Sequence, residues 1–191
     1  MKKLFFIAIA AFGCNLAMAQ DITRPQTSAN VGLTPVKQGN WMVGGTLGGL
    51  GYGFESKSFN INIEPSAAYF VSDGLAIGAK VLGGLRAVSG MDNEWSYGIS
   101  PMVRYFFPQG SSATGRFFGQ GEVGIGGSSV GSDVSFLAGL SAGYAHFITQ
   151  SVALETTLGY RYNKANISTS TSASGLNIGL GFQIYLPGKR N

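Results

Sequence analysis

The stretch 176–186, LNIGLGFQIYL, alternates a large apolar residue with a small or polar one at almost every step. Successive side chains of a β-strand point to opposite faces, so this period of two predicts a strand with one apolar face. The opposite face carries Asn177, Gln183 and Tyr185. A strand of about ten residues with this pattern is typical of a β-strand that crosses a membrane.

Seven earlier segments have the same texture, and turn-forming residues separate them. The expected strands cover residues 40–53, 58–71, 75–87, 94–107, 115–127, 133–147, 151–162 and 175–186. Tight turns at 72–74 and 148–150 on one side, and a Ser/Thr-rich loop at 163–174 on the other, fit a transmembrane barrel. The sequence therefore predicts an all-β protein, an eight-stranded antiparallel up-and-down transmembrane β-barrel, over residues 39–186.

The first 19 residues have the three parts of a secretory signal peptide. Lys2 and Lys3 precede the apolar run 4–12, LFFIAIAAF, and Ala17 and Ala19 are the small residues that a signal peptidase recognises. The apolar run is too short for a membrane-spanning helix, which needs about 20 residues. We therefore expect export and cleavage after residue 19.

Cys14 offers one alternative, a lipoprotein anchor, which the bulky Phe12 before it disfavours. With cleavage after Ala19, the mature chain has no cysteine and so no disulfide. Residues 20–38 are polar and contain two prolines, which predicts a flexible periplasmic leader. Residues 187–191 form a short polar tail after the last expected strand.

Charge is scarce along the chain, at 12% of residues, whereas glycine is abundant, at 30 residues. Soluble domains carry about twice this fraction of charge. Without Lys2 and Lys3, the 13 basic residues become 11 against 9 acidic ones, a net charge of +2. This near-neutral balance gives no reason to expect a nucleic-acid partner.

Aromatic residues gather at the ends of the expected strands, as in the girdles that mark the two membrane–water boundaries. The inner rim is expected to hold Trp41, Tyr69, Phe70, Phe106, Phe107, Phe117, Phe118, Tyr144, Phe147 and Tyr185. The outer rim is expected to hold Tyr52, Phe54, Phe59, Trp95, Tyr97, Phe136, Tyr160 and Tyr162. A general preference of aromatics for strands would not place them at strand ends.

A soluble eight-stranded barrel of the lipocalin kind is the competing fold, with its apolar face inward and its polar face in water. Here the polar faces of the strands consist largely of Gly, Ala and Ser with few charges. Such residues make a poor soluble surface but a suitable lining for a narrow lumen.

The segments 99–106 (ISPMVRYF), 147–155 (FITQSVALE) and 179–186 (GLGFQIYL) resemble the OmpA-like and OmpX-like outer-membrane β-barrel family in its stand-alone, Bacteroidetes-type form. The resemblance covers about residues 39–186. It implies the outer membrane of a Gram-negative bacterium, with outer-membrane lipid and lipopolysaccharide around the barrel. It also implies periplasmic chaperones and the outer-membrane insertion machinery as partners.

Two features depart from the family pattern. Such barrels usually end on an aromatic residue that the insertion machinery recognises, but here Leu186 precedes the tail and Tyr185 is the nearest aromatic. Pro65 and Pro101 lie in the middle of expected strands, where proline cannot donate to the ladder. We therefore expect either a β-bulge at each proline or a different strand register there.

No residue pattern indicates catalysis, a cofactor or a metal site. His146 is the only histidine, and strand alternation places it on the lipid face near the inner rim. A histidine-based hydrolase would have to use it, but no metal-ligand cluster accompanies it. The glycines at 119–124 precede no helix pattern, so a phosphate-binding loop is not expected there.

Seven charged residues fall on the lumen-facing side of the expected strands. They are Glu64, Lys80, Arg86, Arg104, Glu122, Glu155 and Arg161. An unpaired charge in a narrow barrel costs several kcal/mol, so we expect an ion-paired, hydrogen-bonded plug. The alternative is a ring of charges that selects ions in an open pore.

These features favour a structural or surface-interaction protein, of the adhesion type, whose outer loops meet a surface ligand. A narrow channel for ions or small solutes is the alternative, and an outer-membrane enzyme is the third and weakest hypothesis.

Overall fold

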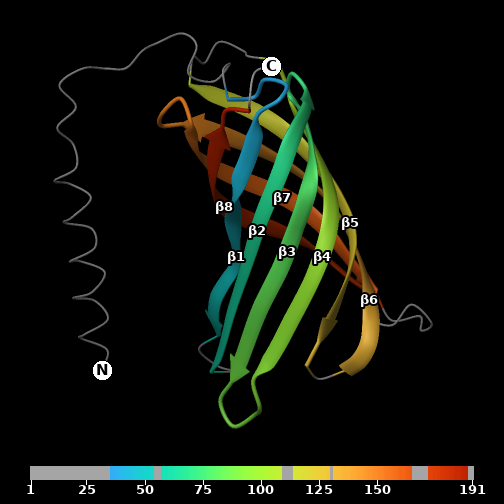
Figure 1. Ribbon diagram of the computed structural model, residues 1–191. Helices are drawn as coiled ribbons and strands as arrows, with labels where there is room; N and C mark the ends of the chain where they lie inside the picture. The colour runs from blue at the N-terminus through green and yellow to red at the C-terminus, as the bar shows by residue number, and fades with distance from the viewer. Residues whose placement is uncertain (1–34, 54–56, 109–113, 130, 165–171, 189–191) are drawn as a thin grey trace, which may run out of the picture.

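The computed structural model describes residues 35–53, 57–108, 114–129, 131–164 and 172–188. The predicted signal peptide lies outside these described residues. The chain forms eight strands in a closed barrel, and Figure 1 shows that these strands are tilted. The strands are β1 (Trp41–Gly53), β2 (Ser58–Ser72), β3 (Leu75–Val88), β4 (Glu94–Phe106), β5 (Gly115–Ser128), β6 (Gly131–Phe147), β7 (Val152–Lys164) and β8 (Ser172–Leu186).

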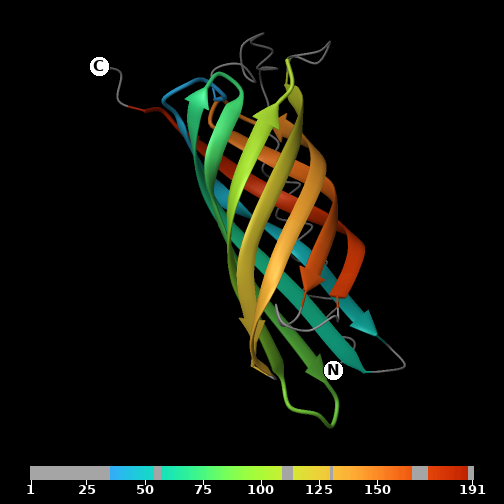
Figure 2. The same ribbon diagram turned by 90° about the vertical axis from the view of Figure 1, so that its right-hand side faces the viewer.

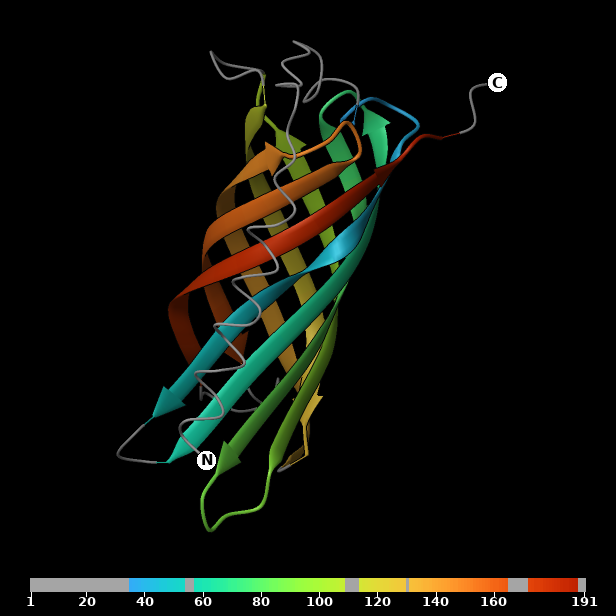
Figure 3. The same ribbon diagram turned by 90° about the vertical axis from the view of Figure 1, so that its left-hand side faces the viewer.

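Each strand pairs antiparallel with its neighbours in chain order, and β8 pairs with β1 to close the barrel. The closing ladder runs from Trp41 opposite Leu186 to Gly48 opposite Gly179. Figures 2 and 3 show this continuous wall from two further sides. We call the end that holds the start of β1 and the end of β8 the inner end, which lies at the top of Figure 1. The fold prediction is therefore confirmed.

The expected bulges at the two prolines were wrong. Pro65 is paired with Gly45, and Pro101 with Ala79, and the register is the same on both sides of each proline. The ladder tolerates them because a strand forms hydrogen bonds on alternating sides, so a single missing N–H does not require an extra residue. The register shifts lie near strand ends instead, for example between Gly126 and Ser128.

The outer wall is apolar over most of its area. Its exposed side chains include Leu140, Leu176 and Leu180, each more than 60% accessible. The buried charged side chains are Glu64, Lys80, Arg104, Arg116 and Glu155, and strand alternation directs all five into the lumen. A soluble protein rarely exposes apolar surface on this scale, so the wall requires hydrocarbon around it. Among the described residues, no helix has the length and apolarity needed to cross a membrane.

The prediction of an aromatic girdle at the inner rim has to be corrected in part. Trp41, Tyr69, Phe107 and Phe117 are exposed on the outer wall as expected. Five other aromatics of the same rim are almost completely buried inside the barrel: Phe70, Phe106, Phe118, Phe147 and Tyr185. Neighbouring residues of a strand face opposite sides, so a pair of adjacent aromatics sends one ring outward and the other inward.

The last residues of the expected flexible leader are packed against the inner end of the barrel. Val36 is 2% exposed and belongs to the same apolar cluster as the buried aromatics. Its carbonyl accepts a hydrogen bond of 2.8 Å from the Gly74 backbone N–H, in the turn between β2 and β3. The side chain of Asn40 donates to the Pro35 carbonyl at 3.1 Å. Residues 35–38 are therefore part of the folded barrel, unlike the expectation.

Candidate functional site

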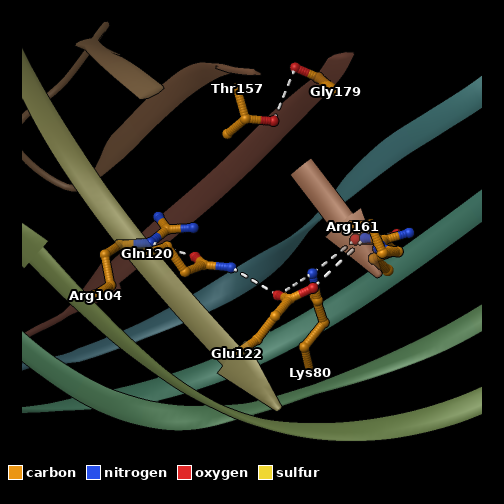
Figure 4. A network of polar contacts seen from close by, with 8 residues as sticks. Lys80, Arg104, Gln120, Glu122, Thr157, Arg161 and Gly179 are labelled. Carbon is orange, nitrogen blue, oxygen red and sulfur yellow. Dashed lines mark hydrogen bonds and ion pairs between the residues drawn. The ribbon is translucent and has the colours of Figure 1, made fainter. Parts of the chain in front are cut away.

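Four charged side chains form a closed ring of alternating sign across the middle of the lumen. We call Glu64, Lys80, Glu122 and Arg161 the charge ring. The Lys80 ammonium lies 2.9 Å from Glu64 and also pairs with Glu122. The Arg161 guanidinium lies 2.7 Å from Glu64 and 3.6 Å from Glu122. Figure 4 shows the pairing of Lys80, Glu122 and Arg161.

The charge ring joins strands that are far apart in the barrel wall. Glu64 comes from β2, Lys80 from β3, Glu122 from β5 and Arg161 from β7. Gly139 of β6 leaves space for this arrangement, because an added Cβ atom would lie 3.0 Å from the Glu122 side chain. Each acid touches both bases, so the ring has two positive and two negative charges and no net charge.

A second ion pair lies nearer the inner end. One nitrogen of Arg104, Nη1, donates to both carboxylate oxygens of Glu155 at 2.8 Å. Both side chains are at most 3% exposed. The Tyr185 hydroxyl also donates to Glu155, at 3.3 Å. A buried pair with several hydrogen bonds is expensive to break, since one charge would remain unpaired.

Gln120 connects this inner pair to the charge ring. Its side-chain oxygen accepts a hydrogen bond of 2.8 Å from Arg104 Nε, and its amide nitrogen donates to Glu122 at 3.1 Å. Both contacts belong to the network drawn in Figure 4. Six of the lumenal charges therefore form one connected network rather than two isolated groups.

The structure brings six of the seven charges expected in the lumen into this network, and Arg86 is the exception. Arg86 faces the same side of β3 as Lys80 but lies two residues before the strand ends. Its side chain is 61% exposed and lies 3.9 Å from Glu94, which is 39% exposed. The expectation for Arg86 was wrong because alternation fixes the face of a residue and not its height in the barrel.

An aromatic layer closes the lumen on the inner side of the network. It consists of five aromatic side chains and one methionine, each at most 2% exposed: Phe70, Phe106, Phe118, Phe147, Tyr185 and Met42. Neighbouring rings lie 5.3 to 6.4 Å apart between centroids. The Arg104 guanidinium lies 4.2 Å from the Phe118 ring centroid, which is a cation–π geometry.

Sequence reasoning missed Gln120, Met42 and the buried Arg116, although strand parity directs all three toward the lumen. Gln120 is two residues before Glu122 and so faces the lumen as well. Met42 accepts a contact of 3.4 Å from Arg104 through its sulfur. Parity gives the face of such a side chain, but only the three-dimensional arrangement shows which charge it contacts.

The free space around the charge ring is small. A cavity of about 30 Å³ lies among Glu64, Lys80, Arg104, Glu122 and Arg161. This is room for about two water molecules. A hydrated ion or solute crossing the barrel would have to break ion pairs here and then pass the aromatic layer.

The remaining candidate residues offer no reactive arrangement among the residues described. His146 is exposed on the outer wall, opposite Gly115 of β5. The glycines at 119–124 lie within β5 and not before a helix. In the described ranges, no cluster of three His, Cys, Asp or Glu residues has the spacing to hold a metal ion.

Comparison with solved structures shows where this fold occurs. The chain is similar to Neisserial surface protein A, with a TM-score of 0.58, 17% identity, and coverage of 77% of this chain and 97% of the other. It is also similar to the N-terminal β-barrel domain of Pseudomonas aeruginosa OprF, with a TM-score of 0.52, 11% identity, and coverage of 78% and 98%. Pseudomonas aeruginosa OprG gives a TM-score of 0.52 and 9% identity, with coverage of 82% and 100%.

No protein-family model matches the sequence, and no curated protein matches it either. The structural similarities, at identities of 17% or less, show the fold alone. The proposed membership in an OmpA-like or OmpX-like family therefore stays a resemblance. The closed barrel with an apolar outer wall, together with these structural relatives, places the chain in the outer membrane of a Gram-negative bacterium.

Proposed function

We propose that this protein is a non-conducting outer-membrane scaffold with a structural or surface-interaction role and no catalytic activity. The observation that carries the proposal is the double closure of the lumen. A charge-balanced network fills its middle, and the aromatic layer fills its inner end. A barrel closed in this way contributes its outer wall and its loops rather than a passage.

The energetics support closure. Separating one partner of a buried ion pair costs about 3–5 kcal/mol, which greatly exceeds thermal energy. A conducting state would have to open several such pairs together and displace rings that pack at the inner end. The alternative role, a narrow channel for ions or small solutes, requires that this closure open under membrane potential.

The outer strand ends supply the surface for an interaction. The turn between β3 and β4 carries Met91, which is 74% exposed, and the nearby Trp95 and Tyr97 are more than half exposed. The proposed partners are lipid and lipopolysaccharide along the outer wall and a surface ligand at the loops. Delivery would depend on periplasmic chaperones and the insertion machinery, with Leu186 presented on the outer wall and Tyr185 buried in the lumen.

Single-channel recording of the purified protein in a planar lipid bilayer tests the proposal. We expect no discrete openings for the wild type. The double variant Phe106→Ala, Phe118→Ala is expected to remain closed as well, because the charge ring still blocks the middle of the lumen. Adding Lys80→Ala and Arg161→Ala to this variant is expected to produce openings. Discrete openings of the wild type would instead establish the channel role.

A further inference from the structure

We propose that the outer half of the lumen is a binding cup for a small, neutral, polyhydroxylated solute of saccharide size. A cavity of about 340 Å³ lies on the outer side of the charge ring. This volume falls within the range of about 300–1,000 Å³ in which proteins hold small molecules. The cup extends to the outer strand ends, because its lining includes Glu94, the first residue of β4, and Ser128, the last of β5.

The floor of the cup has hydrogen-bonding capacity that the protein leaves unused. The Arg161 side chain is 24% exposed, and in the part of the chain that the structure describes its Nη2 pairs with Glu64 and Glu122. Two residues further along β7, the side-chain oxygen of Asn163 is buried and has no hydrogen-bond partner among the described residues. Buried polar atoms are almost always satisfied, so we expect this amide to turn toward the cup, which it lines, when water or a solute can accept or donate a hydrogen bond there.

The walls offer the groups that recognise hydroxyls. Asn62, Ser96 and Ser135 line the cup from three different strands, β2, β4 and β6. An amide presents a donor and an acceptor in one plane, and a hydroxyl can serve as either, so together they suit adjacent hydroxyl groups. Leu82 and Leu137 also line the cup and provide apolar surface for the C–H faces of a sugar ring.

The charge balance of the cup argues for a neutral solute. The charged residues that line it are Glu94 and Arg161, one of each sign. The charge ring under it also has no net charge, and at the mouth Arg86 lies 3.9 Å from Glu94. An ion that entered would lose hydration without meeting a net opposite charge, and that loss is costly. A neutral polar molecule pays no such penalty.

Glycines keep the cup open. A Cβ atom added at Gly84 would lie 2.6 Å from Asn62 Oδ1, and one added at Gly126 would lie 3.1 Å from Leu137. Alanine at these positions would push the lining side chains into the cavity. The outer half of the barrel is therefore built from residues that line a space, whereas a barrel of eight strands is often filled by its own side chains.

Nuclear magnetic resonance titration of the isotope-labelled protein in lipid nanodiscs tests this proposal. The probes are glucose and maltose as neutral saccharides, glucuronate as the anionic analogue and glucosamine as the cationic one. We expect saturable shifts at Asn62, Ser96 and Asn163 with a dissociation constant of about 1 mM for a neutral probe. The charged analogues are expected to bind roughly tenfold more weakly, a difference of about 1.4 kcal/mol.

Two variants separate the cup from the rest of the lumen. Ser135→Trp fills the cavity and is expected to abolish binding, while Asn163→Ala is expected to weaken it about tenfold. Asn177→Ala is the matched control, because Asn177 faces the lumen at the level of the small central cavity and does not line the cup. It is expected to change the affinity by less than about twofold.

The proposal is overturned if no neutral saccharide gives saturable shifts up to about 100 mM. Tighter binding of glucuronate than of glucose would also overturn it and would identify Arg161 as an anion site. Full binding by Ser135→Trp, or equal losses for Asn163→Ala and Asn177→Ala, would place the shifts outside the cup. A heat-shift gel on each variant identifies those that remain folded barrels.

Discussion

The inner and outer halves of the lumen are built by the same eight strands but are filled in opposite ways. In the inner half, glycine gives space that a large side chain then occupies, as where Gly143 faces the Phe118 ring. In the outer half, Gly126 lines the cup, and Gly84 lies against the smaller polar side chains of Ser96 and Asn62. One barrel can therefore combine a tightly packed inner half with a polar cup in its outer half, and the charge ring separates the two.

The largest effect is expected from breaking the buried ion pair of the inner half. Glu155→Ala leaves the Arg104 charge without its carboxylate, in a site where both side chains are at most 3% exposed. We expect a loss of about 3–5 kcal/mol in the free energy of unfolding, measured by equilibrium urea unfolding in lipid vesicles.

A double variant provides the control for this loss. Arg104→Met combined with Glu155→Leu removes both charges and keeps the volume, so it is expected to recover most of the stability. If Glu155→Ala costs less than about 1 kcal/mol, water must reach the pair and the inner half is not dry.

The second prediction is a variant that raises the free energy of unfolding instead of lowering it. Gln183 is completely buried in the inner half, and neither its amide nitrogen nor its oxygen has a hydrogen-bond partner among the described residues. A buried, unsatisfied polar group costs about 1–3 kcal/mol, so Gln183→Leu is expected to stabilise the barrel within this range. The same urea unfolding measures it.

The sign of the stability change of Gln183→Leu also shows whether the inner half of the lumen contains ordered water. If ordered water satisfies the amide, the substitution will destabilise the protein, and the inner half will contain hydration that its packing conceals. Asn177→Leu serves as the control, because Asn177 lines the central cavity, where water can reach its amide. We expect that substitution to give no gain in stability.

The barrel itself could be predicted because alternation is a local property of the sequence. The expected strand limits differ from those of the structure by at most three residues, at the start of β8. Lys80, Arg104 and Glu155, to which parity assigns the lumen-facing side, are buried in the structure. Parity and strand order therefore gave the face of these charged residues but not their partners.

The remaining details depend on height and on neighbours from distant strands. Arg86 has the lumen-facing parity but lies on the outer side of the charge ring, so it pairs with Glu94 instead. The aromatic layer was predicted as a lipid-facing girdle, because proximity to a strand end was weighed without parity. Phe106 and Phe107 illustrate the error, since the first is buried and the second is exposed.

The smallest effect is expected at the outer mouth. Arg86 and Glu94 lie 3.9 Å apart and are 61% and 39% exposed, so water solvates both charges. Exposed pairs contribute about 0–1 kcal/mol, and Glu94→Gln is therefore expected to change the unfolding free energy by less than about 1 kcal/mol. The change should shrink further in high salt, because counterions screen charges that are open to solvent.

Glu94→Gln and Glu155→Ala thus remove a carboxylate from the two ends of one lumen. A loss above about 2 kcal/mol for Glu94→Gln would mean that the mouth is as dehydrated as the inner pair. The proposed saccharide could then not enter or leave the cup through the outer mouth. Similar small losses for both variants would mean instead that water reaches the whole lumen, and the charge ring would no longer separate two environments.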